Sequence, residues 1–192
     1  MALTYTPLTE LEAVNIMLEV IGEQPVNSLP ADGVADALVA ETLLHHTSRE
    51  VQSLKLNCNT EEKFKISPDV NGYINIPEAV LICEPYYRGY GYNYVQRGTK
   101  LYDKTNQTLV FTRDVYLNLT SFLAFTELPA PVRNYITILA AMRFQDRVLG
   151  SDAVAALTAD DVQAAWRLVV STELSICKLN LLDSPSFAGL RR

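Results

Sequence analysis

Residues 10–29 constrain the fold more than any other part of the chain, because they predict a short helix with a defined start and a defined end. Apolar residues recur there at the 3.6-residue spacing of an amphipathic helix: Leu11, Val14, Met17, Leu18 and Ile21. Thr9 and Glu12 have the spacing of a capping box at the start. Gly22 and Pro25 favour an end just after the helix. The pattern predicts the first helix of a bundle, followed at once by a sharp turn.

Three further helical patterns follow this block. The second covers about residues 36–54 with Asp32 as its cap, the third covers 131–149 with Gly150 as its stop, and the fourth begins after Thr158. The side of the second helix that we expect to be buried carries these residues: Ala35, Leu38, Val39, Thr42, Leu43, His46 and Val51. Helices from both halves of the chain are therefore available to one bundle.

The middle of the chain, residues 57–128, has a different pattern. Short alternating or β-branched runs are separated there by Pro, Gly and Asn residues, which is typical of strands joined by turns. The expected strands include residues 63–66, 73–76, 92–96 and 109–112. The segment predicts a small β-module between the second and third helices.

The predicted fold class is therefore α+β: a helical bundle from the N- and C-terminal halves with an inserted small antiparallel β-module. The expected domains are a discontinuous helical domain of residues 8–56 and 129–182, the β-module of residues 57–128, and an extended C-terminal tail of residues 183–192. A hydrophobic content of 48% in 192 residues is sufficient for a substantial core.

The charge balance argues against a dedicated nucleic-acid-binding protein. The chain has 22 acidic residues against 16 Lys and Arg, a net charge of −6, whereas DNA binding requires clustered cations. Three cysteines without C-x-x-C spacing predict neither a disulfide framework nor a zinc site. The first residues lack the basic and apolar regions of a signal peptide, and no apolar run approaches the ~20 residues of a membrane helix. We expect a protein that is neither exported nor inserted in a membrane.

Histidines on the second predicted helix are the first candidate for chemistry. Glu41 with His45, and His46 with Glu50, are four residues apart and could begin a metal site. However, the chain has no other histidine, and the two adjacent rings point about 100° apart around the helix. Solvated or capping polar pairs are the favoured interpretation.

Neighbouring acidic residues at 61–62 and 160–161 are the second candidate, because a glycosidase uses two carboxyl groups. Acids at a turn or at a helix start explain both pairs more simply. The sequence also lacks the G-x-S-x-G, Walker and H-E-x-x-H motifs. We therefore predict no catalytic, cofactor-binding or metal-binding residue and no enzymatic activity.

A tyrosine-rich run within residues 84–98 is a candidate partner interface, and its candidate residues are Tyr86, Tyr87, Tyr90, Tyr92 and Tyr94. The last three alternate, so on a strand they would share one face. Tyrosine is enriched where proteins meet, which favours an interface. A small β-module has little else to bury, which equally favours an aromatic core. Both interpretations stay open.

The C-terminal tail is the other candidate interface, through Phe187, Leu190, Arg191 and Arg192. An apolar anchor between small residues and two cations suits a segment that binds in a groove on a neighbouring molecule and becomes ordered there. A terminal segment without a role is the alternative.

As a string of residues, the first helix and its turn resemble the opening of the tail tubular protein A family of short-tailed, podovirus-type bacteriophages. The resemblance is carried by Ala13-Val14-Asn15, Ile21-Gly22-Glu23 and Pro25-Val26-Asn27-Ser28-Leu29. It continues through Asp36-Ala37, Val39-Ala40 and residues 49–53, 59–62 and 102–105. One departure is visible after the second helix, where the family usually carries a Gly-Trp pair and this chain has Lys55-Leu56.

The resemblance implies a structural adaptor, or gatekeeper, rather than an enzyme. It implies a dodecameric ring that joins the portal protein to the nozzle, a tail tubular protein B-like protein, and that attaches tail fibre protein. DNA would pass through this ring during ejection without specific binding. Subunits would be made and assembled in the host cytoplasm, possess no cofactor, and reside in the virion tail. The alternatives are a small hydrolase of host surface polysaccharide, which needs two converging carboxylates in a cleft, and a monomeric binding module.

Overall fold

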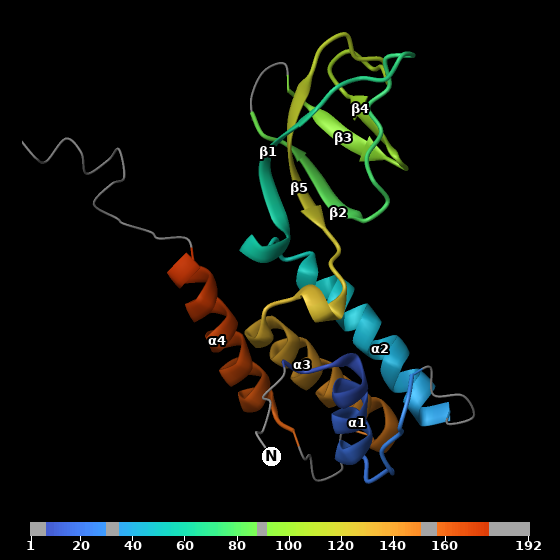
Figure 1. Cartoon of the computed structure of the whole chain (residues 1–192), viewed down its shortest axis with the longest axis vertical. Helices are drawn as coiled ribbons and strands as arrows, with labels where there is room; N and C mark the ends of the chain where they lie inside the picture. Colours follow the sequence, from blue (N-terminus) through green and yellow to red (C-terminus); the bar gives the residue numbers. More distant parts are fainter. Residues whose placement is uncertain (1–6, 30–34, 88–91, 151–156, 177–192) are drawn as a thin grey trace, which may run out of the picture.

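The computed structural model describes residues 7–29, 35–87, 92–150 and 157–176, which form a helical bundle with a β-module at one end (Figure 1). The bundle takes helices from both halves of the chain: α1 (Glu10–Val20), α2 (Ala35–Gln52), α3 (Ala130–Leu149) and α4 (Ala159–Ile176). The module contains β1 (Thr60–Ile66), β2 (Val80–Pro85), β3 (Tyr94–Arg97), β4 (Lys100–Asp103) and β5 (Val115–Ser121). The 3-10 turns η1 (Asn57–Asn59) and η2 (Phe125–Glu127) lie where the chain enters and leaves the module. The predicted α+β class is confirmed.

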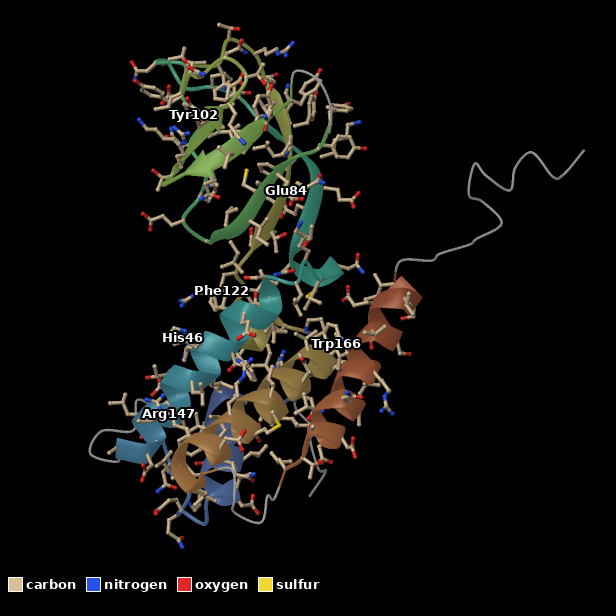
Figure 2. The ribbon with its side chains drawn as sticks, turned by 180° about the vertical axis from the view of Figure 1, so that it is seen from behind. His46, Glu84, Tyr102, Phe122, Arg147 and Trp166 are labelled. Atoms are coloured by element: carbon tan, nitrogen blue, oxygen red, sulfur yellow. The ribbon has the colours of Figure 1, made fainter. Side chains whose placement is uncertain are left out.

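Helix α3 is central to the bundle, because α1, α2 and α4 all pack against it. Its buried residues include Ile136, Ala140 and Phe144, which recur at helical spacing. Trp166 of α4 lies against Tyr135 of α3, with ring centroids 4.9 Å apart (Figure 2). A single helix from the C-terminal half therefore organises the core for helices from both halves.

The predicted ends of α1 are confirmed. The Thr9 amide donates to Glu12 Oε2 at 2.8 Å, and the Glu12 amide donates to Thr9 Oγ1 at 3.2 Å, so both halves of the capping box are present. Gly22 follows the helix with φ +81°, the left-handed conformation that glycine adopts without strain. Asn15 then bonds both backbone groups of Val26, at 3.0 and 2.8 Å, and holds the turn against the helix.

The predicted buried side of α2 is correct only in part. Val51 is buried, and Val39 and Leu43 pack partly buried against the core, but the other four predicted residues are exposed: Ala35, Leu38, Thr42 and His46. The observed buried residues are Ala37, Ala40, Leu44, Thr47, Ser48, Val51 and Gln52, whereas Leu38 is 56% exposed and His46 points away from the core (Figure 2). The true face is made largely of small and polar side chains, which allow α2 to pack against α1 and α3. The prediction from hydropathy favours larger apolar residues, and among the fully buried residues of α2 it includes only Val51.

The strands form an antiparallel three-stranded sheet in the order β1-β5-β2 and a separate β3-β4 hairpin. The predicted strands at 63–66 and 92–96 overlap β1 and β3. The predicted strands at 73–76 and 109–112 contribute isolated bridges only. The sequence patterns do not predict β2, β4 or β5, although β5 alternates between more and less buried residues along its length.

Two aspartates hold the loops of the module. Asp69 Oδ1 accepts from the Tyr73 amide at 2.9 Å, and Asp103 Oδ1 accepts from the amides of Thr105 and Asn106 at 2.8 and 3.1 Å. The Tyr73 amide is the main cause that lowers the pKa of the Asp69 carboxyl. Side-chain oxygens thus satisfy loop amides that no strand pairs.

Amide side chains fasten the module to the bundle. Gln52, at the end of α2, is fully buried; its Nε2 donates to the Leu123 carbonyl at 3.0 Å, and its Oε1 accepts from the Leu123 amide at 2.8 Å. Asn59 Nδ2 donates to the carbonyls of Gln52 and Ser121 at 2.9 and 3.0 Å. The segments entering and leaving the module are therefore tied to each other.

Arg133 of α3 makes a second buried polar cluster beside this junction. Its guanidinium donates to the carbonyls of Leu128 and Leu8, at 2.6 and 3.0 Å, and to the carbonyl of Thr126. The residue is only 9% exposed. One side chain thus orders η2 and the segment that precedes α1, and nothing in the sequence distinguishes it from a solvent-facing arginine.

Candidate partner-binding surfaces

Tyr86, Tyr87 and Tyr92 form an exposed aromatic patch on the β-module, with 37%, 44% and 37% of their surface accessible. Ring centroids lie 4.9 Å apart between Tyr86 and Tyr87 and 5.6 Å apart between Tyr87 and Tyr92. Lys63 and Arg113 place their cationic groups 5.7 and 5.8 Å from the Tyr86 and Tyr92 rings. Tyrosine and arginine are enriched in protein interfaces, whereas lysine is depleted there.

Tyr94 has a different environment. It is 8% exposed and packs edge-to-face against Phe111 in the core of the module, with centroids 5.5 Å apart. Strand β3 begins only at Tyr94, so the predicted alternation does not place it on one exposed face with Tyr92. Tyr94 therefore belongs to the core of the module. For the aromatic patch, the interface interpretation stays a prediction. Tyr90 lies outside the described residues.

Helix α4 carries a second apolar surface. Ala165 and Val169 are buried toward α3. Large apolar side chains elsewhere on the helix are 37–56% exposed: Leu168, Val170, Leu174 and Ile176. Val170 and Leu174 lie one turn apart on the side away from Ala165 and Val169, and we call these two residues the α4 outer face. A contiguous exposed apolar patch marks an interaction site, whereas single exposed apolar residues are normal. The predicted tail residues Phe187, Leu190, Arg191 and Arg192 lie outside the described residues.

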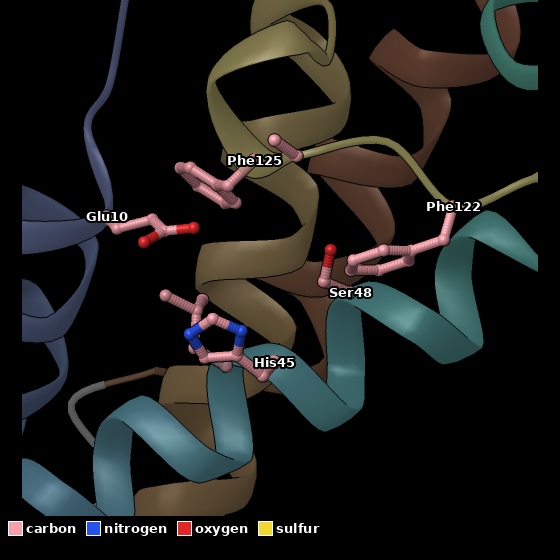
Figure 3. A pocket seen from close by; sticks show the side chains of 7 residues that line it. Glu10, His45, Ser48, Phe122 and Phe125 are labelled. Carbon is pink, nitrogen blue, oxygen red and sulfur yellow. The ribbon is translucent and has the colours of Figure 1, made fainter. Parts of the chain in front are cut away.

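An apolar pocket of about 190 Å³ lies between α1, α2 and the segment that leaves β5 (Figure 3). Leu44, Phe122 and Phe125 line it, with Glu10 reaching in from α1 and His45 from α2. Among the described residues that line it, Glu10 is the single carboxylate, whereas glycosidic hydrolysis uses two. The pocket can hold a small apolar group.

A polar pocket of about 300 Å³ lies over the outer face of the three-stranded sheet. Glu62 and Glu84 both line it, but Lys55 Nζ lies 2.7 Å from Glu84 Oε1 and forms an ion pair. A glycosidase acid instead sits in apolar surroundings that keep it protonated. The surroundings of Glu84 in this pocket are therefore charged, unlike those of the catalytic acid that the hydrolase alternative requires.

Two further candidate carboxyl groups serve a cap and an ion pair. The Thr158 hydroxyl and amide donate to Asp161 at 2.8 and 2.9 Å and lower the pKa of this carboxyl, which confirms its role at the start of α4. Arg143 binds Glu50 through two nitrogens, at 2.7 and 2.9 Å, and lowers the pKa of Glu50. Glu50 is thus held by an arginine rather than paired with His46.

Candidate metal ligands and thiols can be located in the described part of the chain. No group of three or more His, Cys, Asp or Glu residues is placed there to hold a metal ion. Cys58 and Cys83 are free thiols, and burial raises the pKa of Cys83 to about 11. None of the helices in these residues is both long and apolar enough to cross a membrane.

A family model described as tail tubular protein matches residues 11–177. The chain belongs to the tail tubular protein family. It is also similar to tail tubular protein A of Klebsiella phage KP34, with 26% identity over 167 residues that cover 87% of this chain and 88% of that protein. The predicted family is confirmed, and the chain is a structural protein of a bacteriophage tail.

The Lys55-Leu56 departure is accommodated in this tail tubular protein. Lys55 has φ +62°, in the left-handed region that favours glycine. Leu56 is 4% exposed and belongs to the core of the bundle. The two positions therefore have the conformation and the burial that suit the usual Gly-Trp pair, with a smaller side chain at the buried position.

Proposed function

We propose that this tail tubular protein is the adaptor, or gatekeeper, of a short phage tail. It assembles as a dodecameric ring between the portal protein and the nozzle, a tail tubular protein B-like protein. The ring attaches tail fibre protein and forms part of the conduit for DNA ejection. The observation that carries the proposal is the family match over residues 11–177. Assembly takes place in the host cytoplasm, and the subunit resides in the virion tail.

The bundle offers two different sides for a closed ring, as head-to-tail contacts require. Helices α4 and α2 lie on opposite sides of α3 (Figures 1 and 2). The α4 outer face lies on one of these sides. On the α2 side, Leu38 near the start of α2 and Leu54 just after its end are each more than half exposed. Contact between the α4 outer face of one copy and α2 of the next would bury both.

The remaining surfaces fit the other partners of an adaptor. The aromatic patch lies on the module, away from the bundle, and we assign it to another tail component such as the nozzle or fibre protein. The C-terminal tail, through Phe187, Leu190, Arg191 and Arg192, is assigned to the portal. A net charge of −6 suits a conduit that does not retain DNA by charge attraction.

Light scattering of the protein alone and with purified portal tests the proposal. The wild-type protein with portal should give the mass of a high-order ring, whereas Leu174→Glu should leave a folded subunit that does not close the ring. Asn134→Glu, at an exposed position of α3, is the control. A protein that binds portal only as a monomer favours the binding-module alternative, and release of sugars from host polysaccharide favours the hydrolase.

The aromatic patch has a separate test. Tyr86→Ala with Tyr87→Ala should weaken binding to purified nozzle or fibre protein while circular dichroism shows an unchanged fold. Loss of the folded subunit instead would assign both rings to the core of the module, where Tyr94 lies.

A further inference from the structure

We propose that in the free subunit the C-terminal segment, residues 187–192, docks into a groove on the outward face of the subunit's own α1. This groove has a volume of about 590 Å³. Its apolar walls are Leu8, Ile16 and Pro25, and its acidic residues are Glu12, Glu19 and Glu23. We call it the α1 groove. The inference does not depend on the formation of a ring.

The groove is a consequence of how α1 ends. Val14 and Met17 point into the bundle, which leaves Ile16 on another side of the helix, where no other described helix lines the groove. Asn15 binds the amide and the carbonyl of Val26 and draws the turn back along α1. Pro25 thereby forms a wall beside Ile16, and the result is a hollow rather than a flat helix face.

The charge of the groove has no partner among the described residues. Glu12 is engaged by its own cap, but neither Glu19 nor Glu23 forms an ion pair or a side-chain hydrogen bond in the described part of the chain. The N-terminal part of the chain is also acidic, since seven acidic residues and no Lys or Arg precede Arg49. A cationic occupant is therefore favoured over a neutral one.

The C-terminal segment has the complementary composition. The last 16 residues contain three of the chain's 16 Lys and Arg but only one of its 22 acidic residues. Phe187 and Leu190 supply two apolar side chains, and Arg191 and Arg192 follow directly. The apolar pair matches the apolar walls, and the two arginines match Glu19 and Glu23.

Ten residues, 177–186, separate the end of α4 from the C-terminal segment. The end of α4 is held at η1, where Asn57 donates to Glu173 from its amide and its side chain, at 2.8 and 2.7 Å. The ten residues 177–186 can span at most about 33–36 Å. This exceeds the roughly 27 Å length of α4 itself, and α1 and α4 both pack on α3.

Disulfide trapping in the full chain tests the proposal. The three native cysteines are replaced by alanine, and Ile16→Cys is combined with Gly189→Cys. The control combines Ser171→Cys with Gly189→Cys, because Ser171 is exposed on α4 and lies closer to the point where the tail is tethered. At low salt, and at a concentration where light scattering shows monomers, the groove pair should form its disulfide about tenfold faster than the control pair.

Charge reversal identifies the contact. Glu19→Lys with Glu23→Lys should remove the rate advantage, and adding Arg191→Glu with Arg192→Glu should restore it. Equal or slower trapping at the groove overturns the proposal, and disulfides mainly between two chains show that a second copy supplies the segment instead.

A second measurement avoids the cysteine substitutions. The NMR amide signals of Ile16 and Glu19 should shift between the wild-type protein and Arg191→Glu with Arg192→Glu. Unchanged signals overturn the proposal.

Discussion

The bundle and the β-module are stabilised in different ways. The bundle core brings together buried side chains from all of α1–α4, and among the described residues it has about twice as many buried apolar members as the core of the module. The module core is built around Ile74, Leu101 and Leu117. Around it, aspartates at 69 and 103 hold loop backbone that strand pairing leaves unsatisfied.

The difference shows what a chain can do when one region has too little apolar surface for its size. The bundle depends on area removed from water, about 25 cal/mol per Å². The module depends more on hydrogen bonds, each with a modest net value but a high cost when one partner is removed. Between them, Gln52 and Asn59 use amide bonds to join two segments that are far apart in sequence. We expect the two regions to respond differently to substitution.

Phe144→Ala should have the largest effect. Phe144 is fully buried in the bundle, and its truncation should lower the free energy of unfolding by about 4 kcal/mol through lost burial and a cavity. Urea unfolding followed by circular dichroism measures this loss, with Leu149→Ala at an exposed position as the control. Relative to the wild-type protein, hydrogen exchange in Phe144→Ala should show a smaller loss of protection for the amides of β5 than for those of the bundle helices. Equal loss in both regions would mean that they unfold as one unit.

Gln52→Ala should have the next largest effect, because it leaves the amide and the carbonyl of Leu123 without partners at the junction. We expect a loss of roughly 2–3 kcal/mol. Limited proteolysis should then cut between bundle and module faster than in the wild-type protein. Gln163→Ala, on the exposed side of α4, should change neither quantity. Unchanged proteolysis in Gln52→Ala would show that core packing alone holds the junction.

Asp103→Ala should destabilise only the module. Its side chain is 6% exposed and accepts from two loop amides and from Asn106 Nδ2, so its removal should cost about 2 kcal/mol. Asp103→Asn keeps one acceptor oxygen and should cost less. Hydrogen exchange should report the loss in β3 and β4. Equal deprotection of α3 would contradict a separate role for the loop bonds.

Substitutions of Lys55, which lies in the turn between the two regions, should change the free energy of unfolding least. Lys55→Ala keeps the left-handed strain and loses the ion pair with Glu84, whereas Lys55→Gly loses the same pair but relieves the strain. Gly should therefore be more stable than Ala by about 1 kcal/mol, and the exposed ion pair itself should contribute less than that. Urea midpoints of the two variants measure the difference. Identical midpoints would show that the turn is unstrained.

Local signals in the sequence were sufficient for much of the fold. The capping box at Thr9 and Glu12, the glycine after α1 and the cap at Thr158 act over three or four residues, so their outcome does not depend on the rest of the chain. The bounds of α1 and α3 follow from such signals. The family also follows from the sequence, through the run from Ala13 to Leu29 and the match along the chain.

The candidate surfaces could be predicted only in part. A tyrosine-rich run is visible in the sequence, but its division into the exposed aromatic patch and the buried Tyr94 depends on where β3 begins. Lys63 and Arg113 join the patch from β1 and from the loop before β5. No spacing in the sequence connects these residues, because strand pairing brings them together.

The sequence by itself determined the caps, the helix spacing, the insertion of a β-module and the family. Only the tertiary structure decided which side of α2 is buried, and which polar residues enter the interior. Gln52 meets Leu123, and Arg133 meets Leu8, across 71 and 125 residues of chain. A polar side chain is buried only where distant backbone supplies its hydrogen bonds, and that supply exists once the whole chain has folded.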